Sequence, residues 1–141
     1  METGNLKAVV IGAGWAGEGH IRALQHCGVE VVALCARKEE VVREVAARLD
    51  VLRASTNWLR TLDKVRPDIV SLATPAALRI EVVEEATRLG CHLLCEKPLA
   101  TTAEEARQMY DLVTQAGVKH AYAVTQQYDP GVAWVRELLA E

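Results

Sequence analysis

Three glycines near the start of the chain have a spacing that can bind phosphate groups. Gly12, Gly14 and Gly17 form the pattern G-x-G-x-x-G directly after the apolar run 6–11, and an amphipathic stretch over 15–27 follows. A strand, a glycine turn and a helix in this order form the pyrophosphate site of dinucleotide-binding proteins. The first glycine permits a tight turn, the second leaves room for the phosphates, and the third lets the helix pack closely on the strand. We therefore predict a dinucleotide site at this turn.

The start of the expected helix completes this predicted site. Its free N–H groups and the positive end of its dipole would face the bound phosphates. Trp15 and Ala16 lie at this helix start, so we include both with the glycines as cofactor-binding candidates. Small residues also gather in ordinary tight turns, which is the alternative interpretation. The apolar strand expected before the turn favours nucleotide binding.

Basic residues follow the second expected strand, the β-branched run 29–35. That run ends in Ala36, Arg37 and Lys38, with no carboxylate at its tip. In NAD sites a carboxylate about twenty positions beyond the glycines binds the ribose 2′-hydroxyl. Arg37 and Lys38 would instead offer positive charge to a 2′-phosphate, and the next two residues, both acidic, fit a helix first turn. We therefore predict NADP as the cofactor, with NAD as the alternative. The interpretation without a ligand is a solvated basic loop.

Short apolar runs and helical periods alternate along the whole chain. This alternation predicts an α/β fold class, a doubly wound and mostly parallel sheet (Rossmann fold) with right-handed crossovers. We expect strands at 6–11, 29–35, 69–73, 91–95 and 118–124, a short extended piece near 51–54, and a last helix over 130–141. Ligands of such sheets bind beyond the carboxyl ends of the strands. The informative positions are therefore the strand exits at 12–17, 36–38, 74–75, 96–98 and 125–128.

Two sequence signals mark the starts of further helices. Ser55 and Thr56 are candidate caps for a brief helix that follows them. The pattern Thr102-x-x-Glu105 is a capping box and opens a longer helix. On one side of this helix we expect Ala106, Met109, Tyr110 and Val113.

Length, composition and charge exclude several classes of protein. A chain of 141 residues, half of them apolar and a quarter charged, fits one globular domain. The net charge of −3 gives no indication of a nucleic acid or an anionic membrane as partner. No apolar stretch is long enough to span a bilayer, and residues 1–5 lack the pattern of a secretion signal. We therefore expect a cytoplasmic location.

The cysteines do not form a metal site by their spacing. The chain has Cys27, Cys35, Cys91 and Cys95, and the four-residue spacing of the last pair does not match a zinc motif. We expect reduced thiols that act as small buried hydrophobic residues, and no metal.

Three further motifs, taken in order, identify a family resemblance. They are G-x-G-x-x-G-x-x-H over 12–20, Ala-Thr-Pro over 73–75, and G-x-H-x-L-x-E-K-P-L over 90–99. With them the chain resembles, over nearly its whole length, the N-terminal half of the glucose–fructose oxidoreductase / inositol dehydrogenase / MocA (Gfo/Idh/MocA) family. The resemblance implies a pyridine-nucleotide oxidoreductase that acts on a CH–OH group of a sugar, a polyol or a related compound.

The resemblance also implies roles for particular residues. In the family, the lysine of Glu-Lys-Pro lies beside the nicotinamide and contacts the reacting oxygen of the substrate, which makes Lys97 the catalytic candidate. The bond between Lys97 and Pro98 is expected to be cis. The remaining implied cofactor-binding residues are Thr74 and Pro75 in the cofactor channel, Glu96 near the nicotinamide ribose, and Gln126 near the nicotinamide.

Some positions depart from the family pattern. Arg79 stands where the family often has histidine, and 127–130 reads Gln-Tyr-Asp-Pro where the family often has Arg-Phe-x-Pro. We assign no catalytic role to these positions. We interpret His20, which matches the pattern, as a packing residue under the glycine turn.

Family members continue into an antiparallel α+β domain that supplies most of the substrate pocket. We expect that second domain to be absent from this chain. Residues 1–124 would then be the dinucleotide-binding domain, and 125–141 a connecting segment and helix. On this view the isolated chain binds NADP(H) without turnover, and a homo-oligomer is possible only with the missing domain. The alternative function is a non-catalytic NAD(P)-binding regulatory or partner-dependent module.

Overall fold

A computed structural model gives the structure of the chain and describes residues 6–140. The expectation about a secretion signal at residues 1–5 lies outside the described residues. So does Glu141, the expected end of the last helix.

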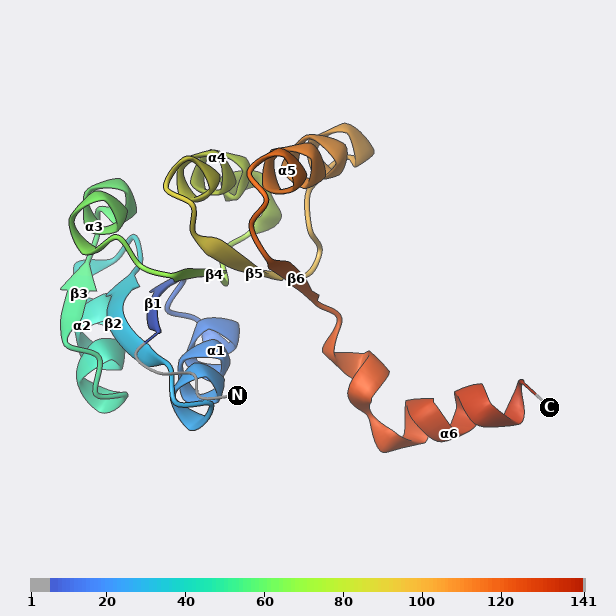
Figure 1. The fold of residues 1–141 in the computed structure, drawn as a ribbon. Coiled ribbons are helices and arrows are strands. Elements are labelled where there is room, and N and C mark those ends of the chain that lie inside the picture. Colours follow the sequence, from blue (N-terminus) through green and yellow to red (C-terminus); the bar gives the residue numbers. More distant parts are fainter. Residues whose placement is uncertain (1–5, 141) are drawn as a thin grey trace.

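The described strands form a single sheet in which all pairings are parallel (Figure 1). Their order across the sheet is β3-β2-β1-β4-β5-β6, the order of the Rossmann fold. The predicted fold class is therefore confirmed. The strands are β1 Lys7–Ile11, β2 Glu30–Cys35, β3 Arg53–Ser55, β4 Ile69–Leu72, β5 His92–Glu96 and β6 His120–Ala123.

Helices cover both faces of the sheet, as the alternating pattern predicts. The helices are α1 Trp15–His26, α2 Glu39–Arg48, α3 Trp58–Val65, α4 Ile80–Arg88, α5 Ala103–Gln115 and α6 Pro130–Leu138, with short 3₁₀ turns η1 Ala76–Leu78 and η2 Thr125–Tyr128. Helices α1 and α2 lie on one face, and α3, α4 and α5 lie on the other (Figure 1).

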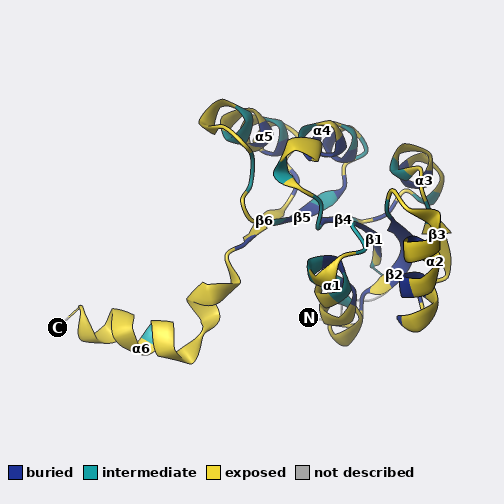
Figure 2. Cartoon of the chain, turned by 180° about the vertical axis from the view of Figure 1, so that it is seen from behind, coloured by how far each residue is buried: buried dark blue, intermediate teal, exposed yellow. Residues whose placement is uncertain are grey.

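The core consists of two layers, one on each side of the sheet. Along β1, Val10 points to the layer that contains Ile21 of α1 and Val42 of α2. Its neighbour Val9 points to the opposite layer, which contains Leu62 of α3. All five side chains are almost completely buried, and Figure 2 shows the central strands in the colour of buried residues. This two-sided burial explains why β1 and β2 read as continuous apolar runs in the sequence.

The last part of the described chain leaves this core. Turn η2 and helix α6 extend away from the sheet and are exposed along nearly their whole length (Figures 1 and 2). The start of α6 is fixed locally, because the Asp129 carboxylate accepts the N–H groups of Gly131 at 2.8 Å and Val132 at 3.3 Å. Pro130 occupies the first turn, where no N–H is needed.

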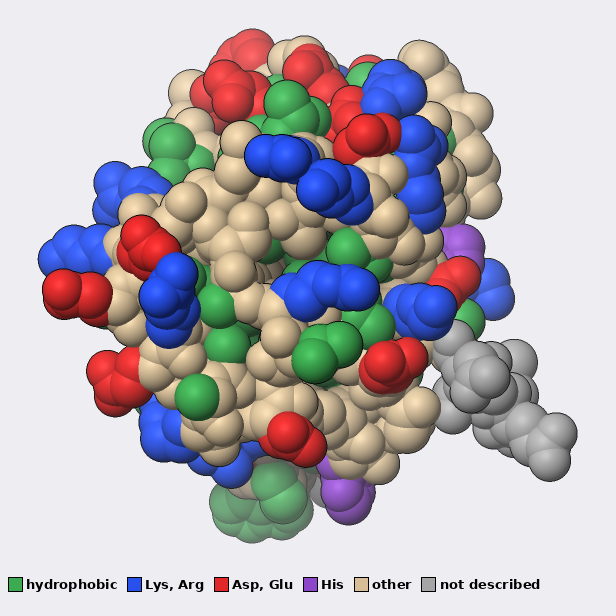
Figure 3. Space-filling view, turned by 90° about the vertical axis from the view of Figure 1, so that its left-hand side faces the viewer, with side chains coloured by type: hydrophobic (Ala, Val, Ile, Leu, Met, Phe, Trp, Pro, Cys, Tyr) green, Lys and Arg blue, Asp and Glu red, His purple; other side chains and the backbone are tan. Residues whose placement is uncertain are grey.

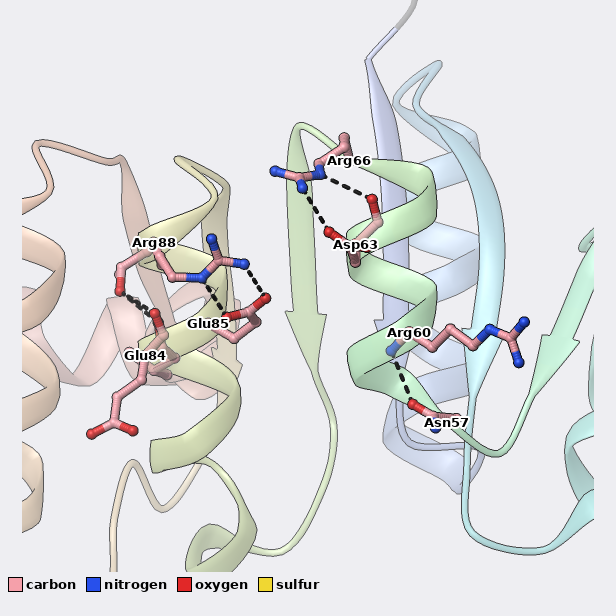
Figure 4. A network of polar contacts seen from close by, with 9 residues as sticks. Asn57, Arg60, Asp63, Arg66, Glu84, Glu85 and Arg88 are labelled. Carbon is pink, nitrogen blue, oxygen red and sulfur yellow. Dashed lines mark hydrogen bonds and ion pairs between the residues drawn. The ribbon is translucent and has the colours of Figure 1, made fainter.

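The N-cap of the brief helix α3 lies two residues after Ser55 and one after Thr56, the predicted caps. Its N-cap is Asn57, whose Oδ1 accepts the N–H of Arg60 at 2.9 Å (Figure 4). The Oγ of Ser55 instead accepts the N–H of Asn57 at 3.1 Å. The cap prediction was therefore wrong in position, because three successive residues of capping type compete for the role.

One of the two hydrogen bonds of the predicted capping box is present at the start of α5. Thr102 Oγ1 accepts the N–H of Glu105 at 3.1 Å, and the Glu105 carboxylate in turn accepts the N–H of Thr101 at 3.0 Å. The side chain of Tyr110, one of the residues expected on one side of this helix, is 51% exposed. Met109 and Val113, which were expected on the same side, are buried.

The cysteines follow the prediction at three positions of four. Cys35, Cys91 and Cys95 are buried, whereas Cys27 at the end of α1 is exposed. Burial raises the pKa of the Cys35 and Cys95 thiols to about 11. Across residues 6–140 no group of three or more His, Cys, Asp or Glu side chains is arranged to hold a metal ion. No helix in that range has the length and apolar character needed to cross a membrane.

Candidate functional site

Two adjoining cavities lie at the carboxyl ends of the strands. The cavity beside β5 and β6 (the β5-side cavity) has a volume of about 950 Å³, and the cavity beside β2 (the β2-side cavity) has about 430 Å³. Gly14, Ala73, Thr74 and Pro75 line both cavities. The two cavities therefore meet between β1 and β4, where the strand order reverses and where Rossmann sheets bind their ligands.

The glycine turn forms the border between the two cavities. Gly12 has a positive φ of +119°, and a Cβ atom there would lie 2.4 Å from the carbonyl oxygen of Ala73. Gly14 is the N-cap of α1, and a Cβ atom there would meet nothing within 4 Å. Gly17 is buried behind the turn. The turn is thus tight at its first glycine, open at its second and closely packed at its third. An anionic group fits in front of α1.

The β2-side cavity is bordered by the residues that follow β2. Ala36 and Arg37 line it, together with Trp58 of α3. Lys38 is the N-cap of α2, is exposed, and is not among the lining residues. Glu81 of α4 also lines this cavity. Glu81 was not predicted from the sequence, because nothing in the local sequence indicates that the first turn of α4 faces the end of β2.

A second set of basic residues lies beside β3, outside the cleft. Arg53 of β3 and Arg60 and Lys64 of α3 line an open groove there. Figure 3 looks onto this side of the molecule, where Lys and Arg side chains (blue) are spread among acidic ones (red). None of these three residues lines the cavities at the strand exits. A substitution at any of the three can therefore serve as a control of equal charge for a substitution at a basic residue of the cleft.

The exit of β4 places an unsatisfied hydroxyl group in the cleft. Thr74 lines both cavities, and its Oγ1 is buried without a hydrogen-bond partner in the described structure. Burying a hydroxyl without a partner is unfavourable, so a ligand with a matching polar group would be favoured at this point. This orphaned atom and the open space at Gly14 are the two local features that fit a polar ligand in the cleft.

The exit of β5 brings Lys97 into the β5-side cavity. Lys97 and its neighbour Glu96 both line this cavity, and the side chain of Lys97 is exposed. The peptide bond between Lys97 and Pro98 is cis, in accordance with the family resemblance.

A buried arginine joins the exits of β4 and β5. Arg79 is 2% exposed, and its guanidinium donates to the carbonyl oxygen of Thr74 at 3.0 Å. It also donates to the carbonyl oxygens of Glu96 and Pro98. Burial lowers the pKa of Arg79 from its ordinary value. No role was predicted for Arg79, since a surface arginine and a buried one look alike in a single sequence.

A polar chain crosses from α1 to the end of β5. His20 Nδ1 lies 2.7 Å from Ser71 Oγ of β4, and His20 Nε2 lies 3.2 Å from Glu96 Oε1. The other carboxylate oxygen, Glu96 Oε2, accepts the N–H of Lys97 at 3.0 Å. The interpretation of His20 as a packing residue was therefore incomplete, because its ring has a polar partner at each nitrogen.

The remaining candidates lie at the outer parts of the β5-side cavity. Gln126 of η2 lines it, as do Trp15 and Ala16 at the start of α1. Trp15 is 92% exposed. Among the sequence-predicted residues, the cleft brings together Gly12, Gly14, Trp15, Ala16, Ala36, Arg37, Thr74, Pro75, Glu96, Lys97 and Gln126. Gly17 and Lys38 are not among its lining residues.

Comparison with known proteins gives consistent matches. A family profile described as "Oxidoreductase family, NAD-binding Rossmann fold" matches residues 6–124. The chain is 31% identical to levoglucosan dehydrogenase from Pseudarthrobacter phenanthrenivorans, over 97% of this chain and 37% of that protein. It is 29% identical to D-glucoside 3-dehydrogenase from Escherichia coli, over 97% of this chain and 40% of that protein. The crystal structure of GenD2 from gentamicin A biosynthesis in complex with NAD is similar, with a TM-score of 0.90 and 27% identity over 100% of this chain and 40% of that one. The chain therefore spans 37–40% of the length of these curated relatives.

Proposed function

This chain belongs to the Gfo/Idh/MocA oxidoreductase family, which has an NAD-binding Rossmann fold, and on that premise we propose that it is the cofactor-binding part of a dehydrogenase. The dehydrogenase would transfer a hydride between a nicotinamide cofactor and a CH–OH group of a sugar, a polyol or a related compound. One observation carries the proposal: the glycine turn and Lys97 open onto the same cleft. The names of the relatives, a levoglucosan and a D-glucoside dehydrogenase, support the substrate class.

Different residues of the cleft would bind different parts of the cofactor. The N–H groups at the start of α1 would hold the diphosphate, with Gly14 leaving the necessary space. Thr74 and Pro75 would line the channel between the two ends of the cofactor. Glu96 and Gln126 would accept and donate hydrogen bonds at the nicotinamide end. The cofactor supplies the carbon that gives or takes the hydride.

Lys97 is the residue to which we assign the reaction. Its ammonium group is exposed in the β5-side cavity, where a substrate oxygen can approach it. It would donate a hydrogen bond to the reacting oxygen and stabilise the negative charge that develops there. The 141-residue chain is expected to bind the cofactor.

We propose NADP as the preferred cofactor, with NAD as the alternative. Arg37 lines the β2-side cavity, where the adenosine end would lie, and a guanidinium can bind a 2′-phosphate through two parallel hydrogen bonds. Glu39, the nearest carboxylate in the sequence, pairs with Arg43 at 2.6 Å on the surface of α2. It is not among the residues that line the cavity.

Titration of the 141-residue chain with NADPH and NADH by calorimetry tests the binding function. We expect both to bind, and NADPH to bind more tightly. If neither dinucleotide binds, the proposed function is wrong. If NADH binds more tightly, the cofactor preference alone is wrong.

Replacement of Lys97 separates an enzyme from a non-catalytic module. In whichever assembly turns over substrate, Lys97→Ala is expected to retain cofactor binding and to lose most of the rate. Lys64→Ala removes an exposed lysine outside the cleft and serves as the matched control. An unchanged rate in Lys97→Ala would favour the regulatory or partner-dependent module instead.

A further inference from the structure

We propose that His20 is a positioning residue, which holds the Glu96 carboxylate in place as a fixed hydrogen-bond acceptor for the nicotinamide ribose. This inference rests on the proposed function, since it names how one end of that cofactor is recognised. It gives His20 a role beyond packing under the glycine turn.

The position of His20 lets it join helix α1 to the strands β4 and β5. It lies on α1, the helix whose start borders the glycine turn, and its side chain is 12% exposed. Its ring nitrogens contact Ser71 at 2.7 Å and Glu96 at 3.2 Å. Ser71 is completely buried in β4, and Glu96 ends β5. One imidazole ring therefore joins a helix and two neighbouring strands.

The chemistry of the three groups fixes the direction of the hydrogen bonds. An ionised carboxylate only accepts hydrogen bonds, so the Nε2 atom of His20 must carry the hydrogen that Glu96 accepts. In a neutral imidazole the other nitrogen is then an acceptor, so the Ser71 hydroxyl donates to Nδ1. The Glu96 carboxylate thus selects the ring form in which His20 donates to it, and the Ser71 hydroxyl, which can donate or accept, adapts to that form. Each group in the chain is satisfied without a buried unpaired donor.

The result is a carboxylate that is held at both of its oxygens. Oε1 accepts from His20 and Oε2 accepts from the backbone N–H of Lys97 at 3.0 Å. Each carboxylate oxygen has a second lone pair, and Glu96 lines the β5-side cavity. A hydroxyl group that enters the cavity therefore finds an acceptor already oriented, and little side-chain freedom is lost on binding. Ribose hydroxyls are donors of the required kind.

Two amide variants of His20 distinguish positioning from packing. In glutamine the terminal nitrogen lies at about the distance of Nε2 from the backbone, so His20→Gln can still donate to Glu96. In asparagine the nitrogen lies at about the distance of Nδ1, so His20→Asn can contact Ser71 but leaves Glu96 without its donor. Both variants are similar in size and polarity, which makes them a matched pair.

The affinity of each variant is measured by calorimetry for two probes. One probe is the intact reduced dinucleotide that the unaltered chain binds more tightly. The other is the corresponding fragment without nicotinamide riboside, ADP or 2′-phospho-ADP. His20→Asn is expected to bind the dinucleotide about tenfold more weakly, since a hydrogen bond to a charged group is lost, and to bind the fragment normally. His20→Gln is expected to bind both probes nearly as the unaltered chain does.

A double variant checks that the effect passes through Glu96. His20→Asn combined with Glu96→Gln should bind the dinucleotide no more weakly than Glu96→Gln alone, because the group that His20 positions is already altered. Additive losses would overturn the inference, and so would a variant His20→Asn that binds both probes normally or neither of them. If the unaltered chain binds no dinucleotide, it is the proposed function that fails.

Discussion

Gly17 packs so closely on Gly12 that a Cβ atom on Gly17 would lie 1.8 Å from the carbonyl oxygen of Gly12. The helix α1 and the turn that precedes it are in direct backbone contact at this point. Gly14, between them, has nothing within 4 Å of the position of its missing Cβ. The same substitution at these two glycines is therefore expected to have opposite consequences.

Gly17→Ala is expected to lower the free energy of unfolding by about 3 kcal/mol or more, because the methyl group would overlap a backbone atom. Gly14→Ala should change that free energy by less than about 1 kcal/mol and instead weaken dinucleotide binding at least about tenfold. Urea denaturation and calorimetry measure the two quantities. Unaltered dinucleotide affinity in Gly14→Ala would show that the phosphates do not lie at this turn.

Arg37→Asp is expected to reverse the cofactor preference. It replaces the guanidinium at the edge of the β2-side cavity with a carboxylate, which repels a 2′-phosphate and can accept a ribose hydroxyl. The ratio of the dissociation constants of NADPH and NADH should change by about a hundredfold, as judged from a pair of charge-assisted hydrogen bonds. Arg53→Asp makes the same change of charge outside the cleft and should leave the ratio unaltered.

Arg79→Met is expected to destabilise the fold by about 2–4 kcal/mol in urea denaturation. The change removes a donor that serves four carbonyl oxygens at the exits of β4 and β5 and leaves those acceptors without it. Arg79→Lys should be intermediate, because an ammonium group cannot reach as many carbonyls in fixed directions. Arg53→Met is the control, at an exposed arginine. A loss smaller than about 0.5 kcal/mol would mean that water replaces the guanidinium without cost.

Stability should fall as the solution becomes alkaline, because of two buried thiols. Burial raises the pKa of Cys35 and Cys95 from 9.0 to about 11. Between these values the unfolded chain loses thiol protons that the folded chain retains, so the free energy of unfolding decreases as pH rises. Each thiol should contribute a loss of about 1 kcal/mol near pH 10. Cys35→Ala and Cys95→Ala should each flatten the measured slope, whereas Cys27→Ala, at an exposed position, should leave it as it is.

The parts of the fold that local sequence determines were predicted well. The first strand, the turn at Gly12 and the helix from Trp15 follow directly from apolar runs and glycine spacing, and the parallel α/β sheet follows from the alternation of strands and helices. The start of α3 was misplaced, because Ser55, Thr56 and Asn57 are all good capping residues and only the packed helix selects the last of them.

The parts of the site that depend on distant contacts were not predicted. Arg79 lies 17 residues from Glu96 and 19 from Pro98 in the chain, and its bonds to them exist only after β4 and β5 are paired. His20 lies 51 residues from Ser71 and 76 from Glu96. No periodic pattern in a single sequence indicates that residues so far apart in the chain are in contact. Both cavities lie at the strand exits, as expected for this fold, but the sequence could not show which side chains from neighbouring helices support those exits.

The pairing of β1 with β4 has a mechanical consequence for the whole molecule. These strands are adjacent in the sheet and join its first half, β1 to β3, to its second half, β4 to β6. A dinucleotide lying across this seam would have to be released before either half could open. Its binding energy would thus slow amide hydrogen exchange in β2 and in β5 together, although no single contact reaches both strands.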